Sequence, residues 1–134
     1  VKEAYYNIPA AGGVNASITD MAHWLRAQMG HEPSVISPET LEILHTPRVK
    51  TLAELRRTKR HMKALEEAYY GLGWRIYRYS EQLLISHFGG VDNGYLAQMA
   101  FLPEFDVGIV TLTNSPSKSF FRILPAFLDE ELGL

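Results

Sequence analysis

The sequence predicts one α+β domain, in which helices precede an antiparallel meander of about four strands and a C-terminal helix packs on the sheet. Apolar residues recur at helical spacing early in the chain, whereas a period-two pattern with β-branched residues dominates the later part. Short connections between the predicted strands favour antiparallel neighbours. We expect loops and helices over residues 1–67 and the sheet with its last helix over 68–134, as a single domain over 1–134.

The composition argues against several classes of protein. Hydrophobic residues make up 46% of the chain and charged residues 21%, as in ordinary globular domains. A net charge of −2 argues against a nucleic-acid surface, and no apolar run reaches the ~18 residues of a membrane span. The absence of cysteine excludes disulfides and thiolate metal sites. Because the chain has neither a signal-peptide pattern nor an initiator Met, we expect a fragment of a longer protein.

Two helices are predicted before the sheet. Residues 1–16 form an extended lead-in and loop, in which Pro9 argues against helix. Ser17 and Asp20 then form a capping-box pattern ahead of apolar residues at helical spacing. A second start follows at Ser37, where a proline and an acidic residue occupy the next two positions.

A run of basic residues lies between these helices and the sheet. Residues 48–63 hold seven of the 13 Lys and Arg residues. A nucleic-acid patch is one interpretation, but no aromatic residue interleaves the run and acidic residues lie within or just after it. We therefore interpret the run as a solvated helical face and expect no nucleic-acid partner.

The four predicted strands fill the second half of the chain. The first begins near Tyr69, where apolar and polar residues alternate, and the others cover residues 83–87, 95–102 and 107–113. The residues at 92–94, Asp-Asn-Gly, are typical of a turn.

The last helix follows the final strand. Its sequence carries a broad apolar stripe suited to covering one face of the sheet. Pro125 lies within this stripe, and we expect it to kink or divide the helix because it removes a backbone donor.

The titratable residues give no pattern of a metal or cofactor site. The histidines are scattered, without an i,i+4 pair, so we expect no metal. Neither glycine pair fits a phosphate-binding pattern, so no nucleotide cofactor is expected. We place His23 and His45 on helix surfaces and His61 in the basic helical face.

One nucleophile pattern, Ser-x-x-Lys, occurs formally at Ser115 and Lys118. In this chemistry the serine lies at a helix start and the lysine one turn later takes its proton. Here the pair precedes an apolar helix rather than a cleft. We interpret Ser115 as a helix-capping residue and Lys118 as a solvent-exposed residue.

The tetrad His87-Phe88-Gly89-Gly90 begins at the last residue of the second predicted strand, and two interpretations of it remain open. In the first, the small residues serve only to turn the chain and His87 is incidental. In the second, Gly89 and Gly90 let a substrate lie along the strand edge, where free N–H groups bind it and His87 is a titratable neighbour.

Five segments in order carry a family resemblance: PAAGGVNASITDMAHWLRAQMG, ISPETLEILHTP, YYGLGWRIY, HFGGVDNGYLAQMAFLP and DVGIVTLTNS. Together they resemble the C-terminal half of class C-type serine β-lactamases and low-molecular-weight penicillin-binding proteins, over nearly the whole chain. The resemblance implies part of that family's fold. It also suggests a periplasmic or secreted location.

The resemblance also assigns roles to the tetrad. His87 stands where the family's third motif has Lys or His, which implies an electrostatic and proton-network role. Gly89 would leave room for substrate, and the Gly90 N–H would form half of an oxyanion hole. Phe88 replaces the family's Thr in the substrate-binding part of the motif, so a hydroxyl that binds a substrate carboxylate is missing. The substrate expected from the family is a small acyl compound: a β-lactam, a peptide or an ester.

The family's nucleophile and base motif, Ser-x-x-Lys, and its second motif, Tyr-x-Asn, precede the region matched here. We therefore expect a serine acyl hydrolase in the longer protein and no turnover by this chain alone. The strand at 107–113 would present an apolar edge, so we expect self-association through it. A non-catalytic α+β binding or scaffold domain is the alternative hypothesis.

Overall fold

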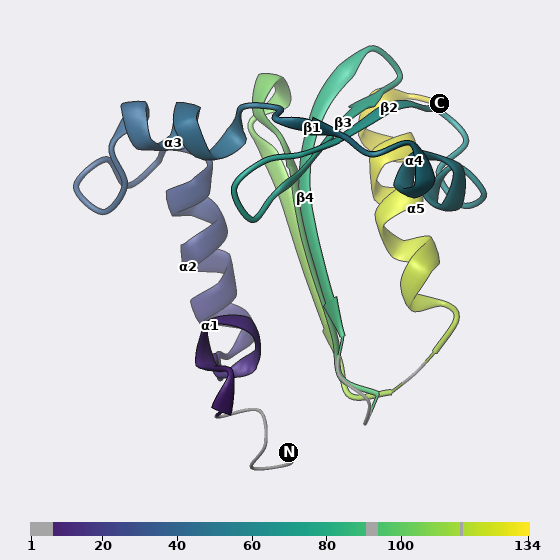
Figure 1. Cartoon of the computed structure of the whole chain (residues 1–134). Coiled ribbons are helices and arrows are strands. Elements are labelled where there is room, and N and C mark those ends of the chain that lie inside the picture. The colour runs from purple at the N-terminus through teal and green to yellow at the C-terminus, as the bar shows by residue number, and fades with distance from the viewer. Residues whose placement is uncertain (1–6, 91–93, 116) are drawn as a thin grey trace.

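A computed structural model describes residues 7–90, 94–115 and 117–134. Its centre is one six-stranded sheet in which strand order follows chain order and neighbours are antiparallel. This arrangement confirms the α+β class and the antiparallel meander (Figure 1). The strands are β1 (Val49–Lys50), β2 (Leu65–Tyr70), β3 (Arg75–Tyr79), β4 (Gln82–Gly90), β5 (Leu96–Leu102) and β6 (Val107–Thr113).

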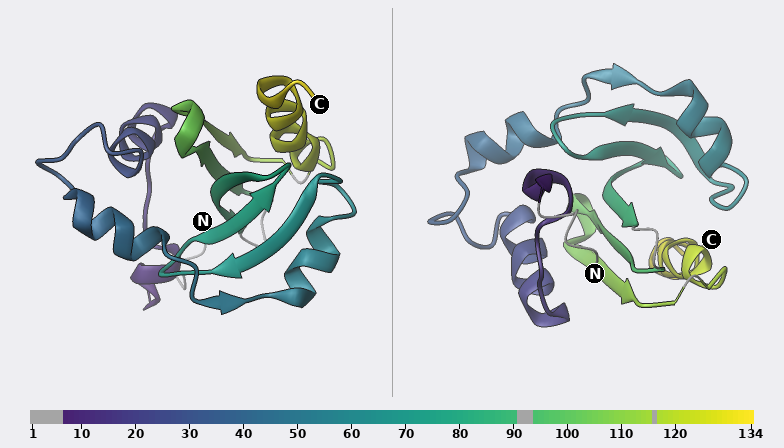
Figure 2. Two further views of the ribbon diagram at one scale, coloured as in Figure 1. Left: turned by 90° about the horizontal axis from the view of Figure 1, so that it is seen from above. Right: turned by 60° about the horizontal axis from the view of Figure 1, so that its bottom comes forward.

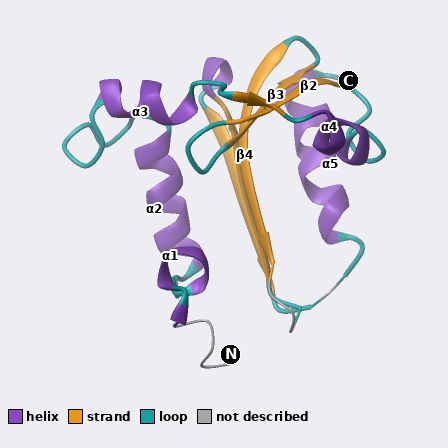
Figure 3. Ribbon diagram, in the orientation of Figure 1, coloured by secondary structure: helices purple, strands orange, loops and turns teal. Residues whose placement is uncertain are grey.

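Helices cover both faces of the sheet (Figures 2 and 3). On one side lie α2 (Ile18–Gln28) and α3 (Pro38–His45), with the short α1 (Pro9–Gly12) before them. On the other lie α4 (Leu52–Thr58) and α5 (Phe120–Leu132). No helix in the described ranges has the length and apolar character needed to cross a bilayer.

Each face has its own hydrophobic core, and β4 contributes to both. Leu84 lies in the core beneath α5 with Leu124, whereas its neighbour Ile85 packs on the α2 side with Leu25 and Trp74. Because successive side chains of a strand point to opposite faces, β4 needs apolar residues at consecutive positions. Below we call these sides the α2 face and the α5 face.

The sheet has six strands instead of the expected four. The two additional strands, β1 and β2, both begin before Tyr69, near which the first strand was predicted to start. The alternating segment near Tyr69 is in fact the end of β2 and the start of β3, separated by a turn. Gly73 makes this turn with a φ of +82°, a conformation that glycine adopts without strain. The predicted basic helix at 48–63 is reduced to α4, with β1 before it.

The expectation that Pro9 argues against helix was wrong, and Pro125 does not divide the last helix. Pro9 begins α1, since the missing N–H of a first helical residue would have no intrahelical partner in any case. α5 continues through Pro125 as one helix. Buried residues on either side, Phe120 and Leu128, hold both halves against the sheet and offset the lost hydrogen bond.

The helix starts predicted at Ser17 and Ser37 are confirmed. Ser17 Oγ accepts the Asp20 N–H at 3.2 Å, and the Asp20 carboxylate accepts the Ser17 N–H at 2.9 Å. The hydrogen bonds from Ser17 lower the pKa of Asp20 below its usual value. Ser37 caps α3 by accepting the Thr40 N–H at 3.3 Å. The predicted turn at 92–94 lies outside the described residues except for Gly94.

His45 packs between the helices and the sheet instead of lying on a helix surface. Its ring meets Trp74 and Phe101 edge-on, with centroids 5.6 and 5.4 Å away. Its Nε2 lies 3.0 Å from Oε1 of Gln28, which is itself 2% exposed. Burial lowers the pKa of His45 because it disfavours the charged imidazolium.

A single hydrogen bond ties α5 to β3. The hydroxyl of Tyr79, a residue only 1% exposed, donates to Oδ1 of Asp129 at 2.5 Å. Burial and this hydrogen bond raise the pKa of Tyr79, since both favour its neutral form.

Replacing Tyr79 by Phe should lower the free energy of unfolding by about 1–2 kcal/mol, because Asp129 loses its donor while the ring still packs. Urea unfolding measures this change. Tyr70→Phe is the matched control, since this β2 residue is 36% exposed, and its effect should stay within about 0.5 kcal/mol. Equal effects of the two substitutions would contradict a role for the Tyr79–Asp129 bond.

The lowered pKa of His45 should make stability depend on pH. Between about pH 7 and pH 5 the unfolded chain binds a proton at this histidine more readily than the folded chain does, so stability falls as the pH falls. His45→Gln keeps a donor for Gln28 but does not titrate, so its unfolding free energy should fall less over this range. His61→Gln, at an exposed position, should retain the wild-type pH dependence. Identical pH profiles for all the proteins would refute this assignment.

Candidate functional site

The end of β4 has one unpaired backbone edge. β4 pairs with β5 from Ile85 to Gly90, but its ladder with β3 stops at Ser86, opposite Arg75. Within the described part of the chain, residues 87–90 therefore have no strand on the β3 side. We call residues 87–90 on this side the open edge. Unpaired N–H and C=O groups at a strand edge can bind an extended ligand.

His87 stands at the start of the open edge on the α2 face. Its side chain is exposed, and its ring lies edge-on to Trp74 with centroids 6.4 Å apart. Its Nδ1 lies 2.5 Å from the backbone carbonyl oxygen of Gly73, in the turn before β3. Sequence reasoning missed this partner, because a backbone acceptor leaves no signal in side-chain patterns.

Gly89 leaves open space beside His87. A Cβ atom built on Gly89 would meet no atom within 4 Å. The alternation along β4 places this space on the α2 face, the same side as His87. A Cβ on Gly90 would instead lie 3.0 Å from Leu96 Cδ2, so that side is filled. The open edge thus combines a titratable ring with a gap on one face.

Phe88 points to the opposite face. Its ring packs against Phe120 and Phe121 of α5, with centroid distances of 6.0 and 5.6 Å. The tetrad therefore divides between the faces, with His87 and Gly89 on the α2 face and Phe88 beneath α5. A substrate-binding role for Phe88 stays a prediction.

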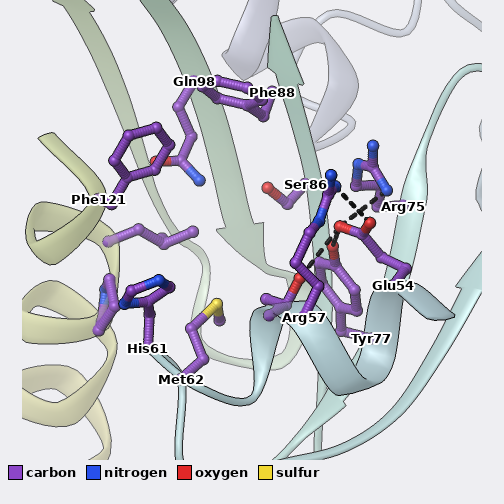
Figure 4. Close-up of a pocket in the computed structure, with 13 residues that line it drawn as sticks. Glu54, Arg57, His61, Met62, Arg75, Tyr77, Ser86, Phe88, Gln98 and Phe121 are labelled. Carbon is purple, nitrogen blue, oxygen red and sulfur yellow. Dashed lines mark hydrogen bonds and ion pairs between the residues drawn. The ribbon is translucent and has the colours of Figure 1, made fainter. Parts of the chain in front are cut away.

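A cavity of about 360 Å³ lies on the α5 face, between α4, α5 and the sheet (Figure 4). Its apolar lining includes Phe88, Phe121 and Met62. At one end, Glu54 accepts hydrogen bonds from its neighbours and forms ion pairs (Figure 4). Its partners are Arg57 at 2.5 Å, Arg75 at 2.9 Å, Thr58 at 3.0 Å and Tyr77 at 3.2 Å.

These contacts give Glu54 a structural role. Four donors occupy its carboxylate, and they tie α4 to β3. Burial, and next the charge of Glu54, raise the pKa of Tyr77 to about 12. A phenol with such a pKa stays neutral near pH 7. Arg57, which belongs to the basic run at 48–63, and Arg75 of β3 are thus both paired with Glu54.

Ser115 is not the cap of α5, because that helix begins only at Phe120 with Ser119 as its N-cap. The Ser115 N–H donates to Thr113 Oγ1 at 3.1 Å, in a turn directly after β6. Lys118 is exposed, as expected. The strand register places Ser115 at the same end of the sheet as the open edge, with β5 between them.

Metal ligands do not gather in the described ranges, where no group of three or more His, Cys, Asp or Glu residues could hold an ion. The open edge thus offers only a histidine, backbone groups and space. Such a wall can position and polarise an acyl group. It holds no activated nucleophile of its own.

Comparison with solved structures relates this fold to a penicillin-binding protein homologue from Pyrococcus abyssi, described as octameric. The TM-score is 0.70 and the identity 26%, over 88% of this chain and 24% of that one. The chain therefore matches about a quarter of that protein.

Two fungal proteins are similar in sequence. The unguisins hydrolase ungD of Aspergillus violaceofuscus is 28% identical over 95% of this chain. The unguisins hydrolase ungD' of Aspergillus campestris is 26% identical over 84% of it. The chain spans only 24% and 20% of these relatives.

A family model covers almost all of the chain and agrees with the segments that carried the resemblance. The model, described as Beta-lactamase, matches residues 1–132. Its match is consistent with the fold shared with the penicillin-binding protein homologue. The chain belongs to the beta-lactamase family of serine hydrolases and their homologues.

Proposed function

We propose that this chain is the C-terminal part of a serine acyl hydrolase and supplies one wall of its active site. The observation that carries the proposal is the open edge, where Gly89 leaves space on the same face as His87. An acyl compound lying along this edge can form backbone hydrogen bonds in the manner of an added strand.

The open edge contributes to the proposed reaction by electrostatic stabilisation. As the carbonyl carbon is attacked, its oxygen gains negative charge, and the Gly90 N–H is the donor assigned to it. His87 acts next to it in the proton network. Gly89 admits the substrate. Each role needs a fixed position, and β5 supplies it by pairing with β4 as far as Gly90.

The nucleophile and base come from the family's Ser-x-x-Lys and Tyr-x-Asn motifs, outside this chain. Covalent acyl transfer needs both groups, because an unactivated serine is a weak nucleophile. The substrate class is a small acyl compound: an ester, a peptide or a β-lactam. The replacement of a hydroxyl residue by Phe88 favours esters and peptides over β-lactams, whose carboxylate loses a donor. Two relatives named as hydrolases of unguisins agree with acyl hydrolysis.

A serine-reactive fluorophosphonate should label a protein that joins this chain to an upstream segment carrying both motifs, and should not label the chain alone. In the joined protein, Gly89→Ala should lower kcat/KM for a chromogenic ester about 100-fold, because the methyl group enters the substrate's space. Its stability should change by less than about 0.5 kcal/mol, since the methyl meets no protein atom.

Leu83→Ala is the control, because Leu83 is 39% exposed on the same face of β4 but lies before the open edge. It should keep full activity. An inactive joined protein would favour the scaffold hypothesis. Stoichiometric labelling of the chain alone at Ser115 would refute the division of the active site.

We also propose that the chain self-associates through β6. In the described residues β6 pairs on one side only, with β5, and exposes Leu112 to 38%. An apolar strand with a free edge is a template for pairing with another chain. The solved homologue described as octameric is consistent with association in this family.

Sedimentation equilibrium should therefore show a mass that rises with concentration. Leu112→Lys should weaken association at least several-fold, because a charge on an edge strand opposes pairing. Leu83→Lys makes the same change at a similarly exposed position on an interior strand, and association should persist. A monomer at high micromolar concentration would rule out the β6 interface.

A further inference from the structure

The hydrogen bond from His87 to Gly73 decides which ring nitrogen is available to a ligand. A carbonyl oxygen has no hydrogen to donate, so at 2.5 Å His87 Nδ1 must carry the proton. A flipped ring would place the Cδ2–H group against this oxygen, far inside normal contact distance. Neutral His87 is therefore the Nδ1–H tautomer, with its lone pair on Nε2.

The position of the Gly73 carbonyl is fixed by the turn around it. Gly73 has a φ of +82°, and the Gly71 N–H closes the turn on the Trp74 carbonyl at 2.8 Å. Trp74 is 6% exposed, and its ring contacts Phe101 edge-on with centroids 5.9 Å apart. The acceptor is thus held by a residue anchored in the core of the α2 face.

The second nitrogen of the ring remains free to meet a ligand. Among the residues that the structure describes, the Gly73 carbonyl is the one hydrogen-bond partner of the His87 side chain, which is exposed. The nearest cation on β3, Arg75, is paired with Glu54 on the α5 face and lines the cavity there. In its neutral form, His87 therefore presents an acceptor to the α2 face.

We propose that Gly73 is a positioning residue that makes Nε2 of His87 a hydrogen-bond acceptor, and that the site prefers acyl compounds with an N–H or O–H group there over compounds with a carboxylate. This inference rests on the proposed function. A carboxylate has only acceptors, so it would face the Nε2 lone pair without a shared proton. A neutral amide can donate to it. The preferred substrates are therefore internal amides and other uncharged acyl compounds that carry an N–H or O–H group at this position.

The tautomer of His87 can be measured by NMR in this chain without the upstream segment. Long-range ¹H–¹⁵N correlation spectra of the imidazoles, at mildly alkaline pH, distinguish a protonated from an unprotonated ring nitrogen. We expect His87 to show a protonated Nδ1 and an unprotonated Nε2, with its signals assigned by their loss in His87→Gln. A predominant Nε2–H form would overturn the proposal.

Gly73→Ala should remove the preference of His87 for the Nδ1–H tautomer. Alanine disfavours a φ of +82°, so the Gly73 carbonyl should move away from Nδ1. Gly133→Ala is the matched control: Gly133 also has a positive φ, +66°, and a Cβ at either glycine would meet no atom within 4 Å. Gly73→Asn should keep the wild-type tautomer, since Asn adopts this conformation more readily, and so tests whether the backbone conformation is what matters. A folded Gly73→Ala with the wild-type tautomer, or a Gly73→Asn without it, would overturn the positioning role.

The substrate preference is tested with N-acetylglycinamide and N-acetylglycine, which differ in the terminal amide and carboxylate. At mildly alkaline pH the amide should shift the Nε2 resonance of His87 in a concentration-dependent way, and the acid should shift it several-fold less. An equal or larger shift with the acid, or none with the amide, would overturn the preference. These readouts require no catalysis, so their failure is distinct from an inactive joined protein.

Discussion

The late start of β3, at Arg75, is the constraint on which the rest of the site depends. β3 pairs with β4 only from Arg75 onward, because the preceding residues turn away at Gly73. One more pair of residues in β3 would place backbone opposite the tetrad and satisfy its free groups. The turn is stable because Trp74 is buried in the core directly after it. A packing requirement on the α2 face thereby creates the open edge.

The two faces of β4 differ in how they are packed. On the α5 face, Phe88 packs against the first turn of α5, and Tyr79 ties the far end of that helix to β3. Contacts with α5 therefore support β4 and its neighbour β3 on the α5 face. On the α2 face, His87 is exposed and the position of Gly89 is empty. Stabilising a transition state requires groups in fixed positions next to a space that the substrate can enter.

Local sequence signals predicted the parts of the fold that local interactions determine. The cap at Ser17 depends on residues three positions apart, so its pattern is visible in the chain. The split near Tyr69 was missed because a Gly-Leu-Gly turn and a continuing alternation share one pattern. The burial of His45 arises from Gln28, Trp74 and Phe101, which only the fold brings together. The strand that carries the tetrad was predicted to end at His87, whereas β4 continues to Gly90, and the division of the tetrad between two faces required the sheet register.

The same division constrains how an acyl group could be attacked at this wall. On the α5 face, the ring of Phe88 packs against α5 and lines a cavity, at one end of which the Glu54 carboxylate already accepts from four donors. Under the proposed function, we expect a nucleophile to reach a carbonyl carbon at the open edge from the α2 face, where Gly89 leaves space. His87, the residue assigned to the proposed proton network, is exposed on that side too. We therefore expect the groups that complete the proposed reaction to lie on the α2 face, where His87 is exposed and Gly89 leaves space.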